Sequence, residues 1–389
     1  KRHPPVLLGA DPRGGAVPPA LDDMRETFAA ADLLALMHQQ SIYRMLLALF
    51  LLVGVATVSL LMRNLAITEQ ARRLYLAGYL LLLAVADLAY LRTRWRKSQD
   101  RFQDYRALAE GLRVQFFWRL AGAPQAAADY YLRKQRSELR WIRDALRVAA
   151  LQSSLPRGGD VEAVQRLWVD EQRDYFRRAA ARDGRRRRGQ RTVGSALVLL
   201  SLSATVAWLA GISRDAPVYI AIATFAGLVL AAHCAYEIVV ALREADSGDH
   251  DALRDMLATA ALSVAIATAI YAALVFGGPL LAQRVSALAI GTSSIDWMLA
   301  AIGITALAGT FAHAYANVRA FGEHEKQYGR MEALFRIATD AITQESTVDE
   351  TTRHVDRVIL DLGCEALAEH ADWLLLHRAR PIELPTAEL

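Results

Sequence analysis

The chain has 389 residues, of which 54% are hydrophobic and 22% are charged, and its formal net charge is +4. Only two cysteines occur, Cys234 and Cys364, which excludes a disulfide scaffold and a cysteine-based zinc site. Unpaired thiols also suit a reducing, cytosolic environment. The phosphate loop, the GxSxG elbow, the HExxH pair and the Rossmann glycine pattern are all missing, so the sequence predicts neither an enzyme nor a cofactor.

The N-terminal residues Lys1–Ala20 are rich in proline and glycine, which indicates a linker. They contain no apolar stretch of the signal-peptide type. Because the chain begins with Lys1 and not with methionine, we expect an earlier domain to precede this linker. An amphipathic helix is expected to follow, so that residues 1–42 form a linker and an N-terminal helix.

Six apolar stretches are the dominant feature of the chain. A helix rises about 1.5 Å per residue and the hydrocarbon core of a bilayer is about 30 Å thick, so about 20 apolar residues can cross it. Backbone amides in lipid must bond within their own segment, so we expect each stretch to be a helix. The stretches are Met45–Met62, Leu74–Leu91, Thr192–Ser213, Val218–Val240, Met256–Leu281 and Trp297–Ala316.

The arginines predict how these stretches are oriented. One cluster lies in Arg92–Arg101, after the second stretch, and another lies in Arg177–Arg191, before the third. The positive-inside rule then predicts six spans with both termini in the cytoplasm, as expected in a bacterial inner membrane. Nucleic-acid binding is not predicted, because no reading motif accompanies the arginines. Apart from this topology signal, four arginines are candidate contacts for anionic lipids: Arg185, Arg186, Arg187 and Arg188.

Charged amphipathic helices are expected outside the spans. Apolar residues recur there at helical spacing, and the region 92–191 shows no strand-like alternation. We expect the apolar faces to pack against one another in a cytoplasmic bundle, with contacts between subunits as the alternative. The predicted helices are Arg101–Leu120, Asp129–Leu151, Val161–Arg182, Glu323–Ile342 and Val348–Leu376.

A few polar side chains fall inside the predicted spans. An ionisable group in hydrocarbon costs at least about 2.5–3.5 kcal/mol, so it normally faces a partner or a water-filled cavity. Asp87 is expected to pair with Arg92 at the interface, and Glu237 with Arg243. Lining a pore or a proton path is the sharper alternative, and metal binding by His233 and Glu237 is the weakest. The candidate pore or gating residues are Asp87, His233, Glu237, His313 and Asn317.

Small residues line several of the predicted spans. The third carries Gly194 and Ser195, and the sixth carries Gly303 and Gly309. In the fifth, Ala261–Ala269 has alanine at every fourth position. Small residues allow helices to approach closely in lipid. The pattern predicts tight helix packing, with a narrow pore as the alternative.

Three segments of the soluble helices resemble a known family. The segment Tyr105–Trp118 (YRALAEGLRVQFFW) resembles the helix that follows the membrane hairpin in SLATT-type proteins. The segments Tyr328–Phe335 (YGRMEALF) and Leu362–Pro381 (LGCEALAEHADWLLLHRARP) resemble the C-terminal tail of related bacterial membrane proteins that carry SLOG, or TRPM-like, sensor domains. This chain departs from the pattern, because it has about six spans instead of two and shows no SLOG domain.

The resemblance implies a helical membrane effector that forms pores or perturbs membranes in bacterial conflict systems. In such systems a linked domain senses a nucleotide-derived signal. The resemblance offers no catalytic residues. Together with the apolar stretches, it leads us to expect an oligomeric effector or channel-like module in the lipid bilayer, gated by a linked or partner sensor. A secondary transporter or a non-conducting scaffold is the alternative, although only Gly277–Pro279 hints at the broken helix that a transporter needs.

The fold class predicted from these observations is all-α, a polytopic membrane protein of about six spans with a cytoplasmic helical bundle. The expected regions are 1–42 (linker and N-terminal helix), 43–91 (membrane hairpin), 92–191 (cytoplasmic helices), 192–318 (four-helix membrane region) and 319–389 (C-terminal cytoplasmic helices).

Overall fold

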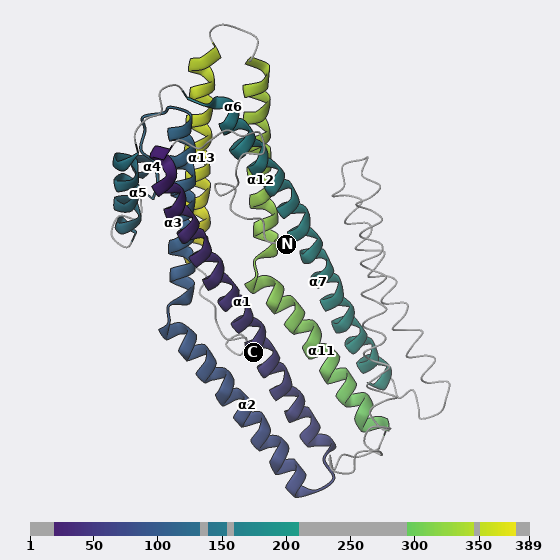
Figure 1. The fold of residues 1–389 in the computed structure, drawn as a ribbon. Helices are drawn as coiled ribbons and strands as arrows, with labels where there is room; N and C mark the ends of the chain where they lie inside the picture. The colour runs from purple at the N-terminus through teal and green to yellow at the C-terminus, as the bar shows by residue number, and fades with distance from the viewer. Residues whose placement is uncertain (1–18, 133–138, 154–158, 210–293, 346–350, 379–389) are drawn as a thin grey trace. The chain divides into compact units, whose positions relative to one another are not determined.

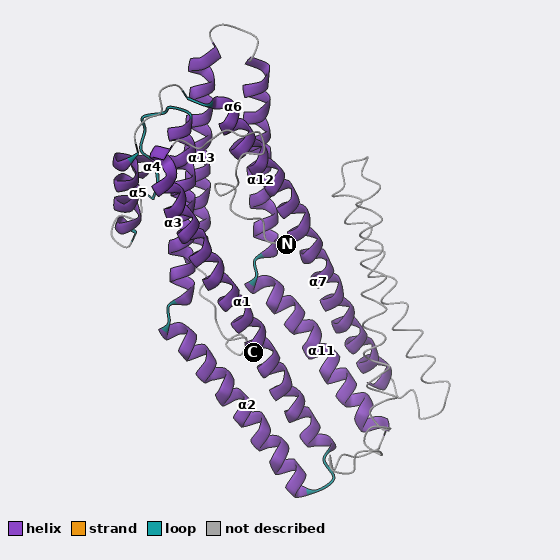
Figure 2. Cartoon of the chain, in the orientation of Figure 1, coloured by secondary structure: helices purple, strands orange, loops and turns teal. Residues whose placement is uncertain are grey.

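The computed structural model describes residues 19–132, 139–153, 159–209, 294–345 and 351–378 (Figure 1). Every secondary-structure element in these ranges is a helix, so the predicted all-α class is confirmed for this part of the chain (Figure 2). The elements are η2 (Pro19–Leu21), α1 (Asp22–Leu65), α2 (Glu69–Trp95), α3 (Ser98–Leu120), α4 (Ala127–Tyr130), α5 (Arg140–Gln152), α6 (Val161–Val164), η3 (Gln165–Asp170), α7 (Glu171–Leu209), α11 (Ser294–Val318), α12 (Phe321–Glu345) and α13 (Thr351–Arg378).

The chain divides into two compact units. The first unit comprises Lys1–Met45, Arg92–Ala181 and Glu325–Glu383. The described residues of the second unit lie in Leu46–Leu91 and Arg182–His324. The helices α1 and α7 pass from one unit to the other without a break, so the expected region boundaries at residues 42 and 191 both fall inside continuous helices.

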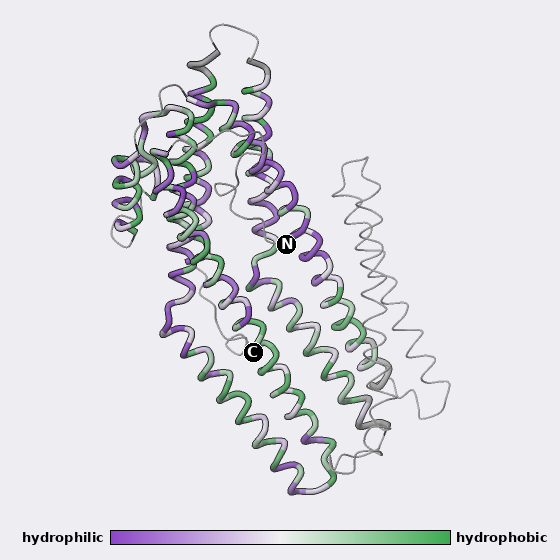
Figure 3. The backbone as a smooth tube through the Cα atoms, in the orientation of Figure 1, coloured by the Kyte–Doolittle hydropathy of each residue, from purple (hydrophilic) through white to green (hydrophobic). Residues whose placement is uncertain are grey.

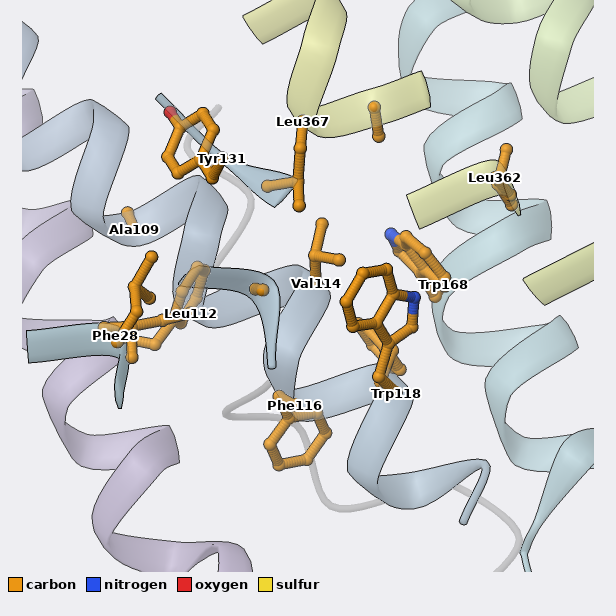
Figure 4. Packing of buried hydrophobic residues seen from close by; sticks show 14 of the residues in the cluster. Phe28, Ala109, Leu112, Val114, Phe116, Trp118, Tyr131, Trp168, Leu362 and Leu367 are labelled. Carbon is orange, nitrogen blue, oxygen red and sulfur yellow. The ribbon is translucent and has the colours of Figure 1, made fainter. Parts of the chain in front are cut away.

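Helix α3 is the centre of the first unit. Nearly every residue from Ala107 to Leu120 is buried, whatever side of the helix it occupies. Such burial on all sides requires packing partners all round, and α13, α4 and α5 provide them. Figure 4 shows the resulting core, in which Trp118, Trp168 and Tyr131 are fully buried among aliphatic side chains.

A tryptophan and a glycine fix the contact between α3 and α13. The indole nitrogen of Trp118 donates a hydrogen bond to the carbonyl oxygen of Ile359 at 3.3 Å. A Cβ at Gly363 would lie only 2.3 Å from the same indole nitrogen. Glycine is therefore required for α13 to approach the indole so closely.

Helix η3 is a π-helical turn that carries Trp168 into the same core. The Trp168 ring stacks on Phe117 with centroids 5.3 Å apart and planes within 3°. It also meets the edge of Phe335 at 5.9 Å. A π-helical turn inserts one extra residue per turn and so rotates the following residues. Here it lies directly before α7, and the tryptophan within it joins α3 to α12.

The predicted single helix Asp129–Leu151 is wrong. Helix α4 ends at Tyr130, and both Tyr131 and Leu132 are non-helical and almost completely buried. Leu132 adopts a positive φ of 51°. The apolar spacing of this segment is compatible with a helix, but burial of both side chains requires the chain to turn there.

The second unit is built from the apolar parts of the long helices, as Figure 3 shows for α2, α11 and the second half of α1. Phe50 meets the edges of Phe311 and Tyr315, with both pairs of ring centroids 5.6 Å apart. In the α1–α2 hairpin, the Ser59 hydroxyl donates to the carbonyl oxygen of Tyr75 at 2.8 Å. These contacts join α1 to α11 and to α2.

Three helical segments of the described part are long and apolar enough to cross a membrane. They are Pro19–Leu65, Glu69–Leu120 and Leu299–Thr343. Their apolar parts include the predicted spans Met45–Met62 and Leu74–Leu91 and most of Trp297–Ala316. The predicted span Thr192–Ser213 is helical as far as Leu209. Val218–Val240 and Met256–Leu281 lie outside the described residues.

Candidate functional site

The helices α7 and α11 cross at two glycines of the second unit. A Cβ at Gly194 would lie 2.9 Å from Nε2 of His313 and 3.2 Å from the carbonyl oxygen of Gly309. A Cβ at Gly309 would in turn lie 2.7 Å from the carbonyl oxygen of Gly194. Only glycine permits this approach, and the close packing predicted for these two small-residue helices is present at this crossing.

Polar side chains in this crossing are satisfied by the protein itself. The Ser195 hydroxyl lies 3.4 Å from Nε2 of His313, and the Ser201 hydroxyl donates to the carbonyl oxygen of Ile302 at 2.8 Å. Thr305, which is completely buried, donates to the carbonyl oxygen of Ala301 at 2.7 Å. Among the candidate gating residues, His313 therefore takes part in a contact between helices.

Asp87 has a different environment from His313. It is exposed on α2, beside Leu80, Leu81 and Leu88, which are 57%, 65% and 66% exposed. Within the described ranges its side chain makes no hydrogen bond or ion pair, so the expected pair with Arg92 is not formed. Five residues correspond to about 140° of rotation around a helix, so the two side chains point in different directions.

Of the three remaining candidates, the structure describes one. Asn317 is exposed near the end of α11, where its backbone carbonyl accepts a hydrogen bond from Ala320 at 3.0 Å. His233 and Glu237 lie outside the described residues, as does the expected partner Arg243. Among residues that the structure does describe, no group of three or more histidine, cysteine or acidic side chains could hold a metal ion.

The four arginines proposed as lipid contacts lie on α7, in the second unit. Arg185 is exposed and makes no side-chain hydrogen bond or ion pair with another described residue. Arg186 is exposed and lies 3.8 Å from Asp183, which is buried. Arg187 and Arg188 are partly buried. The run therefore presents cations to solvent and also packs against the protein.

The sequence analysis missed a buried ionic cluster in the first unit. Arg113 donates to the Glu110 carboxylate at 2.7 Å. Arg106 lies 3.7 Å from the same carboxylate and 3.3 Å from Asp32, and both acids are only 8% exposed. The spacing of Arg106, Glu110 and Arg113 along α3 is the local signal that could have revealed the cluster, since residues three and four apart share a helix face.

Next to this cluster, Tyr131 and His370 form a hydrogen bond between α13 and the turn after α4. The Tyr131 hydroxyl lies 2.6 Å from Nδ1 of His370. Burial lowers the pKa of His370 to about 3, although the nearby Glu110 carboxylate opposes this shift. Burial, assisted by Glu110, raises the pKa of Tyr131 well above its usual range. At neutral pH both groups are uncharged, so the hydroxyl can donate to the ring nitrogen.

Two left-handed residues separate apolar helices from more polar ones. Lys97, between α2 and α3, has φ of 48°, and Ala320, between α11 and α12, has φ of 50°. This conformation costs a non-glycine residue about 1–2 kcal/mol, so the surrounding packing must maintain it.

No protein family, no curated protein and no solved structure matches this chain.

Proposed function

We propose that the chain is an oligomeric membrane effector or channel-like module, gated by a linked or partner sensor domain. The proposed protein has about six spans in a bacterial inner membrane, with both termini and the first unit in the cytoplasm. The resemblance to SLATT-type proteins supports a role in bacterial defence or stress signalling, with a nucleotide-derived signal as the trigger.

One observation carries the proposal: an exposed carboxylate on an apolar helix. Asp87 lies on α2, and only 6% of the most apolar part of the segment Glu69–Leu120 is buried. A carboxylate facing lipid costs at least about 2.5–3.5 kcal/mol. A water-filled path or a neighbouring subunit would remove this cost. Both require Asp87 to face something other than lipid, as it would in an oligomer that encloses a path.

The connections between the units suggest how a signal would reach the path. Helices α1 and α7 each contribute residues to both units without a break. In the proposed mechanism, binding of the sensor repacks α3 and α13 around Trp118. The continuous helices α1 and α7 then carry the displacement into the second unit. Because α3 is buried on all sides, even a small shift there requires its neighbours to move.

Ion flux through liposomes that contain the purified chain tests the proposal. Wild-type protein is compared with Asp87→Asn, using a dye for potassium and another for protons. The matched control is Glu26→Gln, which removes one exposed charge from the first-unit part of α1. We expect Asp87→Asn to change the flux at least several-fold and Glu26→Gln to leave it unchanged. Equal flux through wild type and Asp87→Asn would contradict a path lined by Asp87.

A non-conducting scaffold is the second candidate, favoured by the satisfied polar groups at the α7–α11 crossing. His313 and Ser195 contact each other, and Ser201 contacts a backbone carbonyl. A scaffold predicts no flux under any condition, including with the upstream sensor and candidate nucleotides present. For the transporter alternative, the suggested helix break at Gly277–Pro279 lies outside the described residues.

A further inference from the structure

A belt of arginines on α7 lies directly before an apolar stretch of the same helix. The segment Arg182–Arg191 contains six arginines and a single acidic residue, Asp183. Thr192–Leu209 follows within the same unbroken helix and contains no charged residue. If the apolar stretch lies in a bilayer, the arginines lie at the level of the lipid headgroups.

Asp183, the acidic residue within the belt, neutralises only part of the positive charge of the arginines. The Asp183 carboxylate accepts from Nε of Arg182 at 2.9 Å and lies 3.8 Å from Arg186. It is buried, with only 6% of its side chain exposed, so it is directed into the protein. Arg185 and Arg186 are exposed, and Arg186 keeps 53% of its side-chain surface accessible. These two arginines therefore present a cationic surface to an outside partner.

The belt packs against the α11–α12 turn within the second unit. A Cβ at Gly322 would lie 3.2 Å from Cδ of Arg187, so the arginine stem crosses the turn at this glycine. The turn adds another cation, because Arg319 donates to the Tyr315 hydroxyl at 2.9 Å and lies over the Phe321 ring at 5.0 Å. The turn thus places a further, partly buried arginine and the partly buried Tyr315 ring beside the belt, and arginine with tyrosine is a combination typical of membrane interfaces.

We propose that anionic phospholipid headgroups bind this arginine belt and stabilise the adjoining α11–α12 turn. A guanidinium group can donate two parallel hydrogen bonds to two oxygens of one phosphate, which favours a phosphodiester ligand. The continuity with an apolar helix favours a lipid over a free phosphate, because the acyl chains can then pack beside Thr192–Leu209. The proposal rests on the membrane location proposed above, but not on conduction.

Binding of the anionic phospholipid would also regulate the backbone conformation at Ala320. Its positive φ of 50° has to be maintained by the contacts around the turn, and Arg187 is one of them. A bound headgroup would fix the arginines in place and thereby stabilise the turn. Lipid composition would then alter the conformation of α11 relative to the first turn of α12, both of which belong to the second unit.

A titration of the full chain in neutral detergent tests the proposal. The ligands are short-chain phosphatidylglycerol, short-chain phosphatidylcholine and inorganic phosphate, with binding followed by microscale thermophoresis. We expect phosphatidylglycerol alone to bind. The Arg185→Gln/Arg186→Gln variant should bind it about 10- to 30-fold more weakly, since each arginine near a lipid surface contributes about 1 kcal/mol.

The matched control is Arg140→Gln/Arg147→Gln, which removes two exposed arginines whose acidic partners lie at 3.6 and 3.5 Å. It should keep the wild-type affinity. An Arg185→Lys/Arg186→Lys variant retains the charge that sets topology but lacks the bidentate guanidinium, so it should bind more weakly than wild type and more tightly than the glutamine variant. Equal binding of phosphatidylcholine or inorganic phosphate would overturn the proposal, as would an equal loss in the control. A chain that stays soluble without detergent would instead overturn the membrane location itself.

Discussion

The core of the first unit and the α7–α11 crossing of the second unit bury polar groups by different chemical means. In the first unit, Glu110 lies between two arginines, so opposite charges compensate one another away from water. At the α7–α11 crossing of the second unit, the hydroxyls of Ser201 and Thr305 donate to backbone carbonyls and no charge is involved. Charged contacts respond to pH and to the loss of one partner, whereas neutral hydroxyl contacts respond weakly. We therefore expect these two regions to react differently to the same kinds of perturbation.

The largest expected effect is the loss of the central charge in the first unit. Glu110→Gln keeps the shape of the side chain but leaves Arg106 and Arg113 facing a neutral amide. Removing one partner of a buried ion pair typically costs about 3–5 kcal/mol, and the partial exposure of both arginines reduces this to about 2–3 kcal/mol. Chemical unfolding followed by tryptophan fluorescence measures the loss.

Glu26→Gln is the matched control for that experiment, because Glu26 is exposed. Its effect should stay within about 0.5 kcal/mol. An equal loss of stability in both variants would show that the buried ionic cluster has no special importance for the first unit.

In the second unit, close packing should matter more than any single polar contact. In Gly194→Ala, the new Cβ would lie 2.9 Å from the His313 ring, so α7 and α11 must separate. Overpacking of this kind costs about 1–3 kcal/mol. The thermal midpoint in detergent should fall accordingly. Gly329→Ala is the control, since a Cβ there meets nothing within 4 Å, and alanine should stabilise α12 slightly. A fall of the same size in both variants would refute the close contact.

Lowering the pH should destabilise the first unit, because His370 binds a proton more tightly when the chain is unfolded. Its pKa is about 3 in the folded protein, against about 6.5 in an unfolded chain, so the unfolded state binds the proton more tightly between these values. Stability should be at its full level above about pH 6.5 and fall by about 1–2 kcal/mol on acidification to pH 5. His370→Gln should flatten this part of the stability profile, measured by unfolding at each pH. An unchanged slope in the variant would exclude His370 as the cause.

The smallest effect is expected for the hydrogen bond at the α7–α11 crossing. Ser195→Ala removes the contact with Nε2 of His313, which is long at 3.4 Å. Hydrogen bonds between membrane helices average about 0.6 kcal/mol, so the thermal midpoint should change by only a degree or two. A loss as large as that of Gly194→Ala would mean that the histidine contact, and not close packing, holds these helices together.

Helix positions could be predicted from the sequence because they depend on local spacing. The predicted helix Glu323–Ile342 corresponds to α12, and Val348–Leu376 corresponds to α13, with their ends a few residues away. The turn at Tyr131 and Leu132 could not be predicted, because it depends on burial against α13. The residue that meets Tyr131 there is His370, which is 239 residues away in the chain.

The candidate site was only partly accessible to sequence reasoning. Small residues correctly indicated the crossing at Gly194 and Gly309, because close approach has a compositional signal. The pairing of Asp87 with Arg92 was inferred from proximity along the chain. It is not formed, because the two side chains point in different directions around the helix. The link from Arg106 to Asp32 joins residues 74 positions apart, so no local pattern on α3 reveals it.

The left-handed residues Lys97 and Ala320 have a mechanical consequence. A continuous ladder of backbone hydrogen bonds makes a helix stiff in torsion, and α1 and α7 each keep that ladder for 44 and 39 residues. A single residue at positive φ interrupts the ladder between α2 and α3, and another does so between α11 and α12. A twist of α1 or α7 is therefore transmitted along its whole length, whereas α2 and α11 can keep their own rotation about their axes when α3 or α12 turns.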